Sequence, residues 1–197
     1  MTLFKNKYRI ESARLPGWDY TAEGYYYVTI FTKNRLHYFG CVVNDDLLLH
    51  PMGEIVAEEW LRTPTLRSNV EVDEWVVMPN HMHGILVITR RIPSKSETFQ
   101  RNTQDSETFQ RNTKDSETFQ RNVSTLKANS LGSIIGQFKG ACTKRIWEEI
   151  DPEFGWQTRF WDRIIRDAAE LDRARAYIRN NPLNWEKDQN NEPGLYM

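Results

Sequence analysis

Residues 75–88 read WVVMPNHMHGILVI, and this stretch does more than any other to decide the fold. Two apolar runs, WVVM and ILVI, flank the turn residues PN and are typical of two strands joined at that turn. Successive side chains of a strand point to opposite faces, so His81 and His83 share one face, about 7 Å apart along the strand, while Met82 points toward the core. Two imidazoles in this arrangement can converge on one metal ion.

A second pattern lies near the end of the chain, where residues 167–180 predict a helix. Asp167 and Glu170 form the pattern of a capping box at its start. The helix carries Tyr177, and Asn181 follows four residues later, one turn on and on the same face. A His-apolar-His strand combined with a helical tyrosine and an amide one turn away is what metal-assisted attack by tyrosine on a DNA phosphate requires.

Each part of this pattern also has a plainer interpretation. A single His-x-His in a strand is more often a hydrogen-bonded pair than a metal site. Tyr177 could pack its ring on an amphipathic helix, and Asn181 could end that helix because Pro182 disfavours the helical conformation in the residue before it. The combination, rather than any one residue, supports the catalytic interpretation.

The combination resembles the IS200-like single-tyrosine transposases and, within them, the REP-associated tyrosine transposases. Two strings carry the resemblance, MPNHMHG at residues 78–84 and YIRNNP at residues 177–182, and their order and separation are specific to that family. The resemblance extends over nearly the whole chain apart from one insert. The other matching strings are RLP at 14–16, YYYVTI at 25–30, LGSII at 131–135, FK at 138–139, WQ at 156–157 and DRIIR at 162–166.

This resemblance implies an α+β fold in which a ferredoxin-like antiparallel sheet is flanked by helices, as in HUH endonucleases. One IS200-like catalytic domain would comprise residues 1–91 and 127–185, with a disordered repeat insert between them. The implied activity is that of a transposase: a metal-dependent single-strand DNA endonuclease and strand transferase that forms a 5′-phosphotyrosine intermediate on hairpin-bearing DNA.

The resemblance also assigns roles to individual residues. Tyr177 would be the nucleophile, while His81, His83 and Asn181 would hold a divalent metal ion, Mg²⁺ or Mn²⁺. Two imidazole ligands suit Mn²⁺ better than Mg²⁺, which prefers oxygen. No nucleotide cofactor is expected, because a phosphotyrosine bond keeps the energy of the phosphodiester that it replaces. One tyrosine forms one such bond, so strand exchange needs two sites, as in a homodimer, or two sequential events.

Composition limits the kind of DNA that the chain can bind. With 26 Lys and Arg against 27 Asp and Glu, the formal net charge is −1, which argues against a protein that grips duplex DNA through a basic face. Seven tryptophans and an aromatic share of 12% suit stacking on unpaired bases, so we expect single-stranded DNA with a hairpin as the partner. The candidate phosphate contacts, which could equally be solvated surface charges, are Lys139, Arg163, Arg166, Arg173 and Arg179.

The cysteines and the apolar runs bear on the compartment. Cys41 and Cys142 are too few for a disulfide framework and have no partner at metal-binding spacing, so we expect two inert thiols. No apolar run approaches the ~20 residues of a membrane span, and the N-terminus has no apolar stretch of signal length. These features predict a cytoplasmic protein that does not associate with membranes.

Local patterns predict the remaining elements. The β-rich residues 25–32 and 38–43, separated by a polar turn, predict a hairpin. A helical pattern at residues 55–61 is expected to end near Thr63-Pro64. The other expected elements are strands at 71–78, 81–88 and 157–165, and a helix at 131–146 that Ser130 caps.

Residues 92–126 differ from the rest of the chain. The decapeptide SETFQRNTQD at 96–105 recurs with one change at 106–115 and in part at 116–122. One phenylalanine per ten residues cannot bury enough apolar surface to offset the entropy of ordering, so we interpret this segment as a low-complexity linker. A partner-binding array is the alternative. Residues 186–197 predict a polar tail.

Two rival functions remain open. A metallohydrolase could use His81 and His83 to activate water, with Asp162 or Glu74 as a third ligand or base, but it gives Tyr177 no role. A domesticated DNA-binding or nicking protein without mobility would keep the same residues, so the chain by itself does not distinguish it from a mobile transposase.

Replacing residues 96–122 by a short Gly/Ser linker should leave both folding and DNA cleavage unchanged, because the repeats cannot pack and the loop they occupy tolerates changes in length. The melting temperature and the yield of cleaved single-stranded DNA measure this. A clear drop in melting temperature, or a loss of cleavage, would mean that the repeats pack or bind.

Overall fold

The structure is a computed structural model that describes residues 15–89, 127–188 and 191. The predicted linker at 92–126 and most of the predicted tail at 186–197 lie outside the described residues. In chain order the elements, with η for a 3₁₀ helix, are β1 (Gly24–Phe31), η1 (Lys33–Arg35), β2 (Gly40–Val43), β3 (Asp46–Leu49), α1 (Pro51–Leu66), β4 (Val70–Met78), β5 (His81–Ile88), α2 (Leu131–Glu149), β6 (Trp161–Ile165), α3 (Ala168–Arg179) and η2 (Pro182–Lys187).

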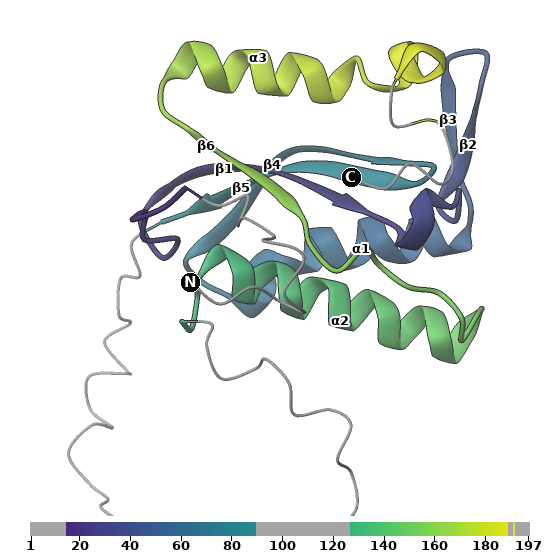
Figure 1. Cartoon of the computed structure of the whole chain (residues 1–197), viewed down its shortest axis with the longest axis horizontal. Helices are drawn as coiled ribbons and strands as arrows, with labels where there is room; N and C mark the ends of the chain where they lie inside the picture. The colour runs from purple at the N-terminus through teal and green to yellow at the C-terminus, as the bar shows by residue number, and fades with distance from the viewer. Residues whose placement is uncertain (1–14, 90–126, 189–190, 192–197) are drawn as a thin grey trace, which may run out of the picture.

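Four strands form one antiparallel sheet in the order β4-β5-β1-β6. Along the chain they occur as β1-α1-β4 and β5-α2-β6, with β2 and β3 inserted between β1 and α1. This is the βαββαβ succession of a ferredoxin-like fold. The α+β class and the antiparallel sheet flanked by helices are therefore confirmed (Figure 1).

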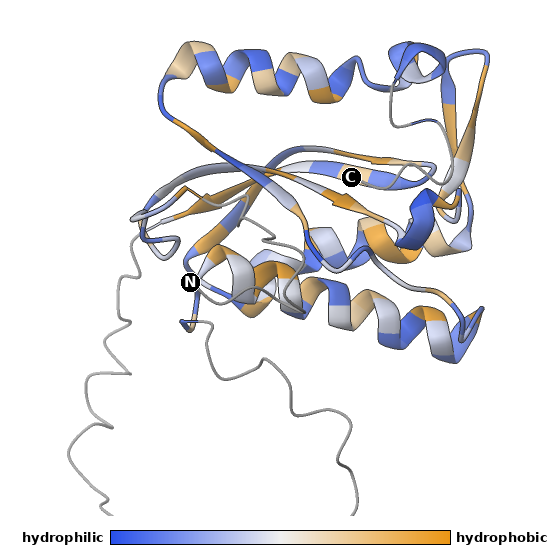
Figure 2. Ribbon diagram, in the orientation of Figure 1, coloured by the Kyte–Doolittle hydropathy of each residue, from blue (hydrophilic) through white to orange (hydrophobic). Residues whose placement is uncertain are grey.

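Helices cover both faces of the sheet: α1 and α2 lie on one face and α3 lies on the other (Figure 1). Alternation along the strands assigns side chains to these two layers. Tyr26 and Met82 point toward α1 and α2, where they join the main core around Trp60. On the other face a smaller apolar cluster contains Ile85 and Ile178. Hydrophilic and hydrophobic stretches alternate along α3, as contact with the sheet through one side requires (Figure 2).

The predicted hairpin between residues 25–32 and 38–43 is wrong. β1 pairs instead with β5 and β6, while β2 pairs with β3 in a separate two-stranded sheet. The turn between β2 and β3 is Asn44-Asp45, whose φ angles of 54° and 68° are those of a two-residue type I′ turn. Local turn chemistry therefore gives β2 its partner. The run DLLL of β3 has no alternation, and for that reason the pattern of the sequence does not predict it.

Two other boundaries differ from the expectation. α1 begins at Pro51, where a missing N–H costs no helical hydrogen bond, and it continues through Pro64 close to its end. β6 is shorter than the predicted 157–165, because the chain before it makes only an isolated bridge, between Trp156 and Thr32. Burial of the apolar face of α1 stabilises the helix by more than the loss of the backbone hydrogen bond at Pro64 destabilises it.

Other expectations agree with the structure. The helix predicted at 131–146 is α2, and the Ser130 hydroxyl accepts a hydrogen bond from the Ser133 N–H at its start. Cys41 and Cys142 are free thiols. Within the described part of the chain, no helix has the length and apolarity needed to cross a membrane.

β5 packs closely against α1 at Gly84. This residue is paired with Val28 and faces α1, and a Cβ atom added to it would overlap the indole ring of Trp60. Trp60 is fully buried in a dense core and cannot move aside without cost. The glycine that follows the histidines is therefore a packing requirement.

We expect Gly84→Ala to lower the free energy of unfolding by about 1–3 kcal/mol through overpacking. Gly136→Ala is the matched control, because a Cβ atom there meets nothing within 4 Å and alanine should stabilise α2 by about 0.5–1 kcal/mol. Urea unfolding of both variants gives the comparison. Trp60→Phe should restore part of the loss in the Gly84→Ala background, and equal stability of Gly84→Ala and the parent chain would contradict the close packing.

Candidate active site

The two histidines lie on the face of the sheet that α3 covers. His81 opens β5, and His83 is paired with Thr29 of β1. Both side chains are almost fully buried, at 0% and 2% exposure, and their Nε2 atoms are 3.0 Å apart. The imidazoles therefore converge, as their spacing in a strand predicts, while Met82 between them points into the main core.

Each imidazole is held through its other ring nitrogen. His81 Nδ1 is 2.7 Å from the side-chain oxygen of Asn80. His83 Nδ1 is 2.7 Å from the Tyr27 hydroxyl and 2.9 Å from the Thr29 hydroxyl, both on β1. Contacts of this kind fix the orientation of each ring and leave the two Nε2 atoms facing each other.

Burial keeps both histidines neutral. The pKa of His81 is well below its usual value of 6.5, first because of desolvation and then because of electrostatic interactions with His83 and Arg35. Desolvation also lowers the pKa of His83 to about 3. At neutral pH both rings are therefore in the neutral form that binds metal ions.

Tyr177 stands beside this pair on α3. Its ring meets that of His83 edge-on, with the centroids 5.3 Å apart, and lies 6.4 Å from that of Tyr27. The residue is 49% exposed, so a ligand can reach it. Burial and then the charge of Asp188 raise the pKa of Tyr177, and a side-chain hydrogen bond with Asn181 opposes this rise. The tyrosine is thus a neutral phenol until a positive charge approaches.

Helix α3 is fixed at its start and along its length. The Asp167 carboxylate accepts a hydrogen bond from the Glu170 N–H, as the sequence predicts for a cap. Glu170 in turn accepts a bond from the N–H of Arg166, one residue before the position that a regular capping box uses. Farther along, Arg175 makes two hydrogen bonds to Asp73 of β4. These contacts hold the helix, and the tyrosine that it carries, over the histidine pair.

Asn181 lies just beyond α3, where η2 begins. The backbone there keeps helical angles, with φ at −61° and ψ at −43°, although Pro182 follows. The side chain is buried, and its Oδ1 atom has no hydrogen-bond partner among the described residues. Within η2, the Trp185 ring packs 6.0 Å from the ring of His81. The chain after α3 therefore returns to the histidine pair.

The separation of the two imidazoles and the chemistry of the Asn181 oxygen suit a divalent metal ion. Two ligand atoms about 2.1 Å from one ion and at a right angle lie about 3.0 Å apart. The Nε2 atoms of His81 and His83 have that separation. The buried Oδ1 of Asn181, without a partner in the described part of the chain, adds the oxygen donor that Mg²⁺ and Mn²⁺ prefer, and the imidazoles favour Mn²⁺.

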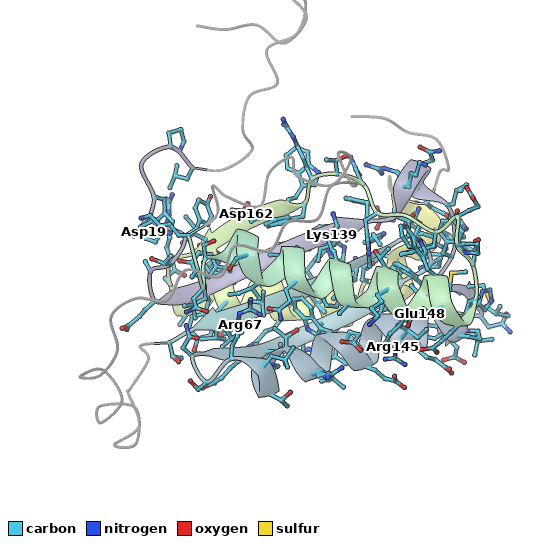
Figure 3. The ribbon with its side chains drawn as sticks, turned by 90° about the horizontal axis from the view of Figure 1, so that it is seen from below. Asp19, Arg67, Lys139, Arg145, Glu148 and Asp162 are labelled. Atoms are coloured by element: carbon cyan, nitrogen blue, oxygen red, sulfur yellow. The ribbon has the colours of Figure 1, made fainter. Side chains whose placement is uncertain are left out.

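The rival metallohydrolase site lacks its third ligand. Among residues 15–89, 127–188 and 191, no three His, Cys, Asp or Glu side chains gather where they could hold a metal ion. Asp162 is paired with Val28 and so points to the face of α1 and α2, away from the histidines (Figure 3). Glu74 forms an ion pair of 3.5 Å with Arg179. Among the described residues, neither Asp162 nor Glu74 therefore joins the two histidines as a third metal ligand, as the rival function would need.

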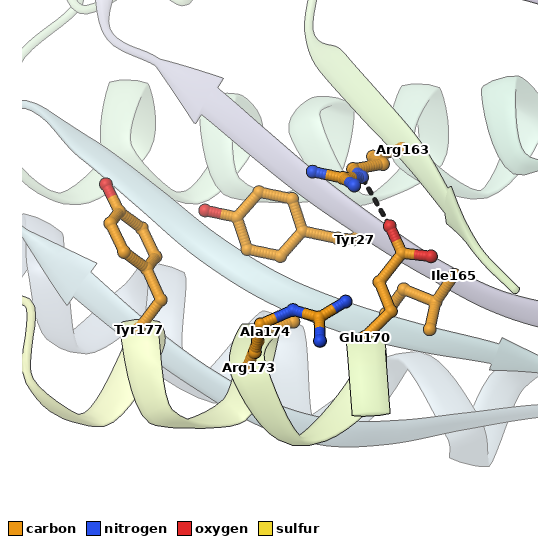
Figure 4. A pocket seen from close by; sticks show the side chains of 7 residues that line it. All are labelled: Tyr27, Arg163, Ile165, Glu170, Arg173, Ala174 and Tyr177. Atoms are coloured by element: carbon orange, nitrogen blue, oxygen red, sulfur yellow. Dashed lines mark ion pairs between the residues drawn. The ribbon is translucent and has the colours of Figure 1, made fainter. Parts of the chain in front are cut away.

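Four of the five predicted phosphate contacts lie around α3. Arg163 and Arg173 line a pocket of about 420 Å³ that Tyr177 also lines (Figure 4). Arg166 is exposed on the turn before α3, and Arg179 is partly engaged by its ion pair near the end of the helix. Of these four arginines, Arg163 and Arg173 therefore share a pocket surface with the tyrosine.

Lys139, the fifth, lies apart from the tyrosine. It belongs to α2, on the opposite side of the sheet (Figure 3). Its Nζ donates a 2.6 Å hydrogen bond to the Gln157 carbonyl, and burial lowers its pKa to about 8. In this position it braces the chain between α2 and β6, so the structure does not bring it together with the other site residues.

Four residues of the site were not predicted as members of it: Tyr27, Thr29, Asn80 and Trp185. Tyr27 and Thr29 are two residues apart on β1 and therefore point to the same face of the sheet. Only the register between β1 and β5 shows that they contact His83. Asn80 could have been found from its position next to His81. No local pattern places Trp185 near the histidines.

Comparison with known proteins supports the fold and gives the chain a relative. No protein-family model matches it. An uncharacterized protein of Haemophilus influenzae is 32% identical over 182 residues, which span 90% of this chain and 91% of that protein. The chain therefore belongs to the same family as the Haemophilus influenzae protein.

Among solved structures, a REP-associated tyrosine transposase bound to a REP hairpin has a similar fold. The TM-score is 0.52 at 18% sequence identity, and the match covers 87% of this chain and 73% of the other. At this identity the likeness concerns the fold, and it agrees with the α+β architecture of an antiparallel sheet flanked by helices.

The buried histidines should make the metal-free protein less stable in mild acid. Their pKa values are lower in the folded chain than the unfolded value near 6.5, so below pH 6.5 the unfolded state binds protons that the folded state excludes. The free energy of unfolding should therefore fall as the pH drops from 7.5 to 5, by about 2 kcal/mol for each histidine.

Urea unfolding in EDTA at several pH values between 5 and 7.5 measures this loss. In this range the carboxylates whose pKa is lowered, such as that of Asp73, stay ionised and add little. The double variant His81→Gln, His83→Gln should lose most of the slope. A parent chain whose stability is constant over this range would refute the burial of neutral imidazoles.

Proposed function

We propose that this chain is a metal-dependent tyrosine nuclease and strand transferase that acts on single-stranded DNA, as a transposase does. The observation that carries the proposal is the edge contact of 5.3 Å between the rings of Tyr177 and His83, next to two Nε2 atoms 3.0 Å apart. A half-exposed phenol beside a candidate cation site suits attack on a phosphate ester. The protein of similar fold is a tyrosine transposase bound to a REP hairpin, which supports DNA as the substrate.

Tyr177 would act as the nucleophile. Its hydroxyl oxygen attacks phosphorus, the new P–O bond forms, and the bond from phosphorus to the 3′ oxygen of the preceding nucleotide breaks. The products are a 5′-phosphotyrosine and a free 3′-hydroxyl, which takes up a proton as the phenol loses one. Because burial raises the pKa of Tyr177, the phenolate needs help, and the side-chain hydrogen bond with Asn181 gives part of it.

His81, His83 and Asn181 would hold the divalent cation, Mn²⁺ or Mg²⁺. A cation bound there draws charge from the phosphate oxygens and favours the phenolate. To bind the cation, the imidazole rings of His83 and His81 must also be correctly oriented. Tyr27 and Asn80 provide this orientation through their contacts with the two Nδ1 atoms.

The reaction exchanges one phosphoester bond for another, so it needs no nucleotide cofactor. The 3′-hydroxyl of another strand can attack the phosphotyrosine and restore a phosphodiester by the reverse of the first step. One Tyr177 per chain allows one covalent bond per site at a time. Strand exchange then requires a second copy of the chain, as in a homodimer, or two sequential events.

The preferred substrate is single-stranded DNA with a hairpin beside the cut, in keeping with the REP hairpin that is bound to the transposase of similar fold. A near-neutral chain has little charge with which to hold a duplex, whereas exposed aromatic side chains near the site, such as Trp161 at 48% exposure, can stack on unpaired bases. Short repeated palindromes in the DNA that flanks the gene would favour mobility. Their absence would favour a domesticated nicking protein.

The sharpest test is whether the protein becomes covalently attached to DNA. Labelled single-stranded DNA from the flanking region, carrying its hairpin, is incubated with the protein and Mn²⁺ and then separated on a denaturing gel. We expect a protein–DNA adduct with the parent chain and none with Tyr177→Phe, which removes only the nucleophilic oxygen and should cost less than about 1 kcal/mol of stability.

Further variants distinguish the residue that attacks the phosphate from the residues that support the attack. Tyr27→Phe should keep the adduct but slow its formation by roughly 10- to 100-fold, because it loosens His83 without removing the nucleophile. EDTA, or the pair His81→Ala and His83→Ala, should abolish nicking, while the exposed His50→Ala should not. Nicking without an adduct would favour activated water, and an adduct in Tyr177→Phe would move the nucleophile to another tyrosine.

A further inference from the structure

A pocket distinct from the histidine pair opens beside Tyr177, between β6 and α3 (Figure 4). Its volume of about 420 Å³ lies within the range of small-ligand sites. Its lining combines apolar and aromatic side chains, of which Ile165 is buried at 8% exposure, with one carboxylate and two guanidinium groups. Besides Tyr177 it is lined by Tyr27, Ile165, Ala174, Arg163, Glu170 and Arg173.

The charged groups of the pocket differ in how far they are engaged. Glu170 receives an ion-pair contact of 2.5 Å from Arg163 and a 3.0 Å hydrogen bond from the Arg166 N–H, one on each oxygen. Each carboxylate oxygen can accept two hydrogen bonds, so capacity for a ligand remains. Arg173 makes no ion pair with any described residue. The pocket thus has a net positive charge and an acceptor with free lone pairs.

These features together select the ligand class. An apolar floor does not suit a bare phosphate, and two arginines do not suit a purely apolar ligand. A flat heterocycle attached to a phosphate satisfies both, because the ring can cover Tyr27 and Ile165 while a guanidinium takes the phosphate. A carboxylate in the wall then favours a base whose edge offers N–H groups, and in a duplex that edge is already occupied by the pairing base.

The pocket also lies along the path that a DNA strand needs in order to reach the tyrosine. Tyr177 is part of its lining, so a nucleotide in the pocket lies next to the phosphate that Tyr177 would attack. Two residues before Arg163 on β6, Trp161 points to the same face of the sheet and is 48% exposed. It offers a stacking surface for a neighbouring base.

We propose that this pocket binds the base of one unpaired guanine nucleotide beside the scissile phosphate, with Glu170 accepting hydrogen bonds from the base and Arg173 contacting the phosphate of that nucleotide. Unpaired guanine presents N1–H and an amino group side by side, more adjacent donors than any other DNA base. The placement next to the scissile phosphate rests on the proposed nuclease function, whereas the ligand chemistry rests on the pocket alone.

Deoxynucleoside 5′-monophosphates test the ligand chemistry without any DNA cleavage. The full chain is titrated with dGMP, dAMP, dCMP, dTMP and dIMP, and binding is followed by NMR line shape and by tryptophan fluorescence. dIMP differs from dGMP only by the missing amino group. We expect dGMP to bind more tightly than dIMP by roughly 5- to 100-fold, the usual worth of a good base contact.

Three variants assign that preference to residues. Glu170→Gln keeps the size and the helix-capping geometry but should lose the discrimination between dGMP and dIMP. Arg173→Gln should weaken all five ligands by a similar factor, because a phosphate contact does not read the base. Arg62→Gln is the matched control, since this exposed arginine belongs to α1, on the opposite face of the sheet from the pocket, and it should change neither quantity.

Each outcome decides the proposal. Equal binding of dGMP and dIMP, unchanged discrimination in Glu170→Gln, or no saturable binding of dGMP below about 10 mM would overturn it. The nuclease function fails separately, if no covalent adduct forms at Tyr177. Selective dGMP binding without an adduct would leave a guanine nucleotide pocket on a protein of another activity, and an adduct without selective binding would refute the pocket alone.

Discussion

The pairing of β1 with β5 is the interaction on which the rest of the site depends. Its register puts His83 opposite Thr29 and brings the hydroxyls of Tyr27 and Thr29 within hydrogen-bonding distance of His83 Nδ1. A shift of one residue would turn both histidines into the apolar core and Met82 outward. The same register places Gly84 against Trp60. The pairing of β1 with β5 therefore fixes both the close packing of β5 on α1 and, on the other face of the sheet, the orientation of the His83 ring.

Burial gives the histidines their chemistry. An exposed imidazole near pKa 6.5 is partly protonated in mild acid, whereas these two stay neutral because the sheet and α3 exclude water from them. The same burial raises the pKa of Tyr177, so the site is electrostatically incomplete without positive charge. In the proposed reaction, the phenol of Tyr177 would therefore be a weak nucleophile until both a cation and a phosphate are bound. This would limit its reaction with other esters.

Helix α3 joins the two candidate functions of the site. Its inner face carries Tyr177 to the histidines, and its first two turns supply Glu170 and Arg173 to the neighbouring pocket. Glu170 both completes the start of the helix and forms a wall of that pocket. A strand of DNA seated there would contact one rigid helix at its nucleophile and at its base-binding groups, so positioning and recognition would share the same anchor on β4, the pair of Arg175 with Asp73.

The sequence by itself determined the elements whose reason is local. It predicted the strands on either side of Pro79-Asn80, the shared face of His81 and His83, and the cap of α3, because alternation and capping depend on neighbours in the chain. It could not give the partner of β1, since the wrong hairpin and the observed pairing with β5 and β6 use the same alternating pattern. The roles of Tyr27 and Thr29, and the contact of Trp185 with His81, were decided only by the tertiary structure, because sheet register and the docking of α3 and η2 arise from contacts between residues more than fifty positions apart.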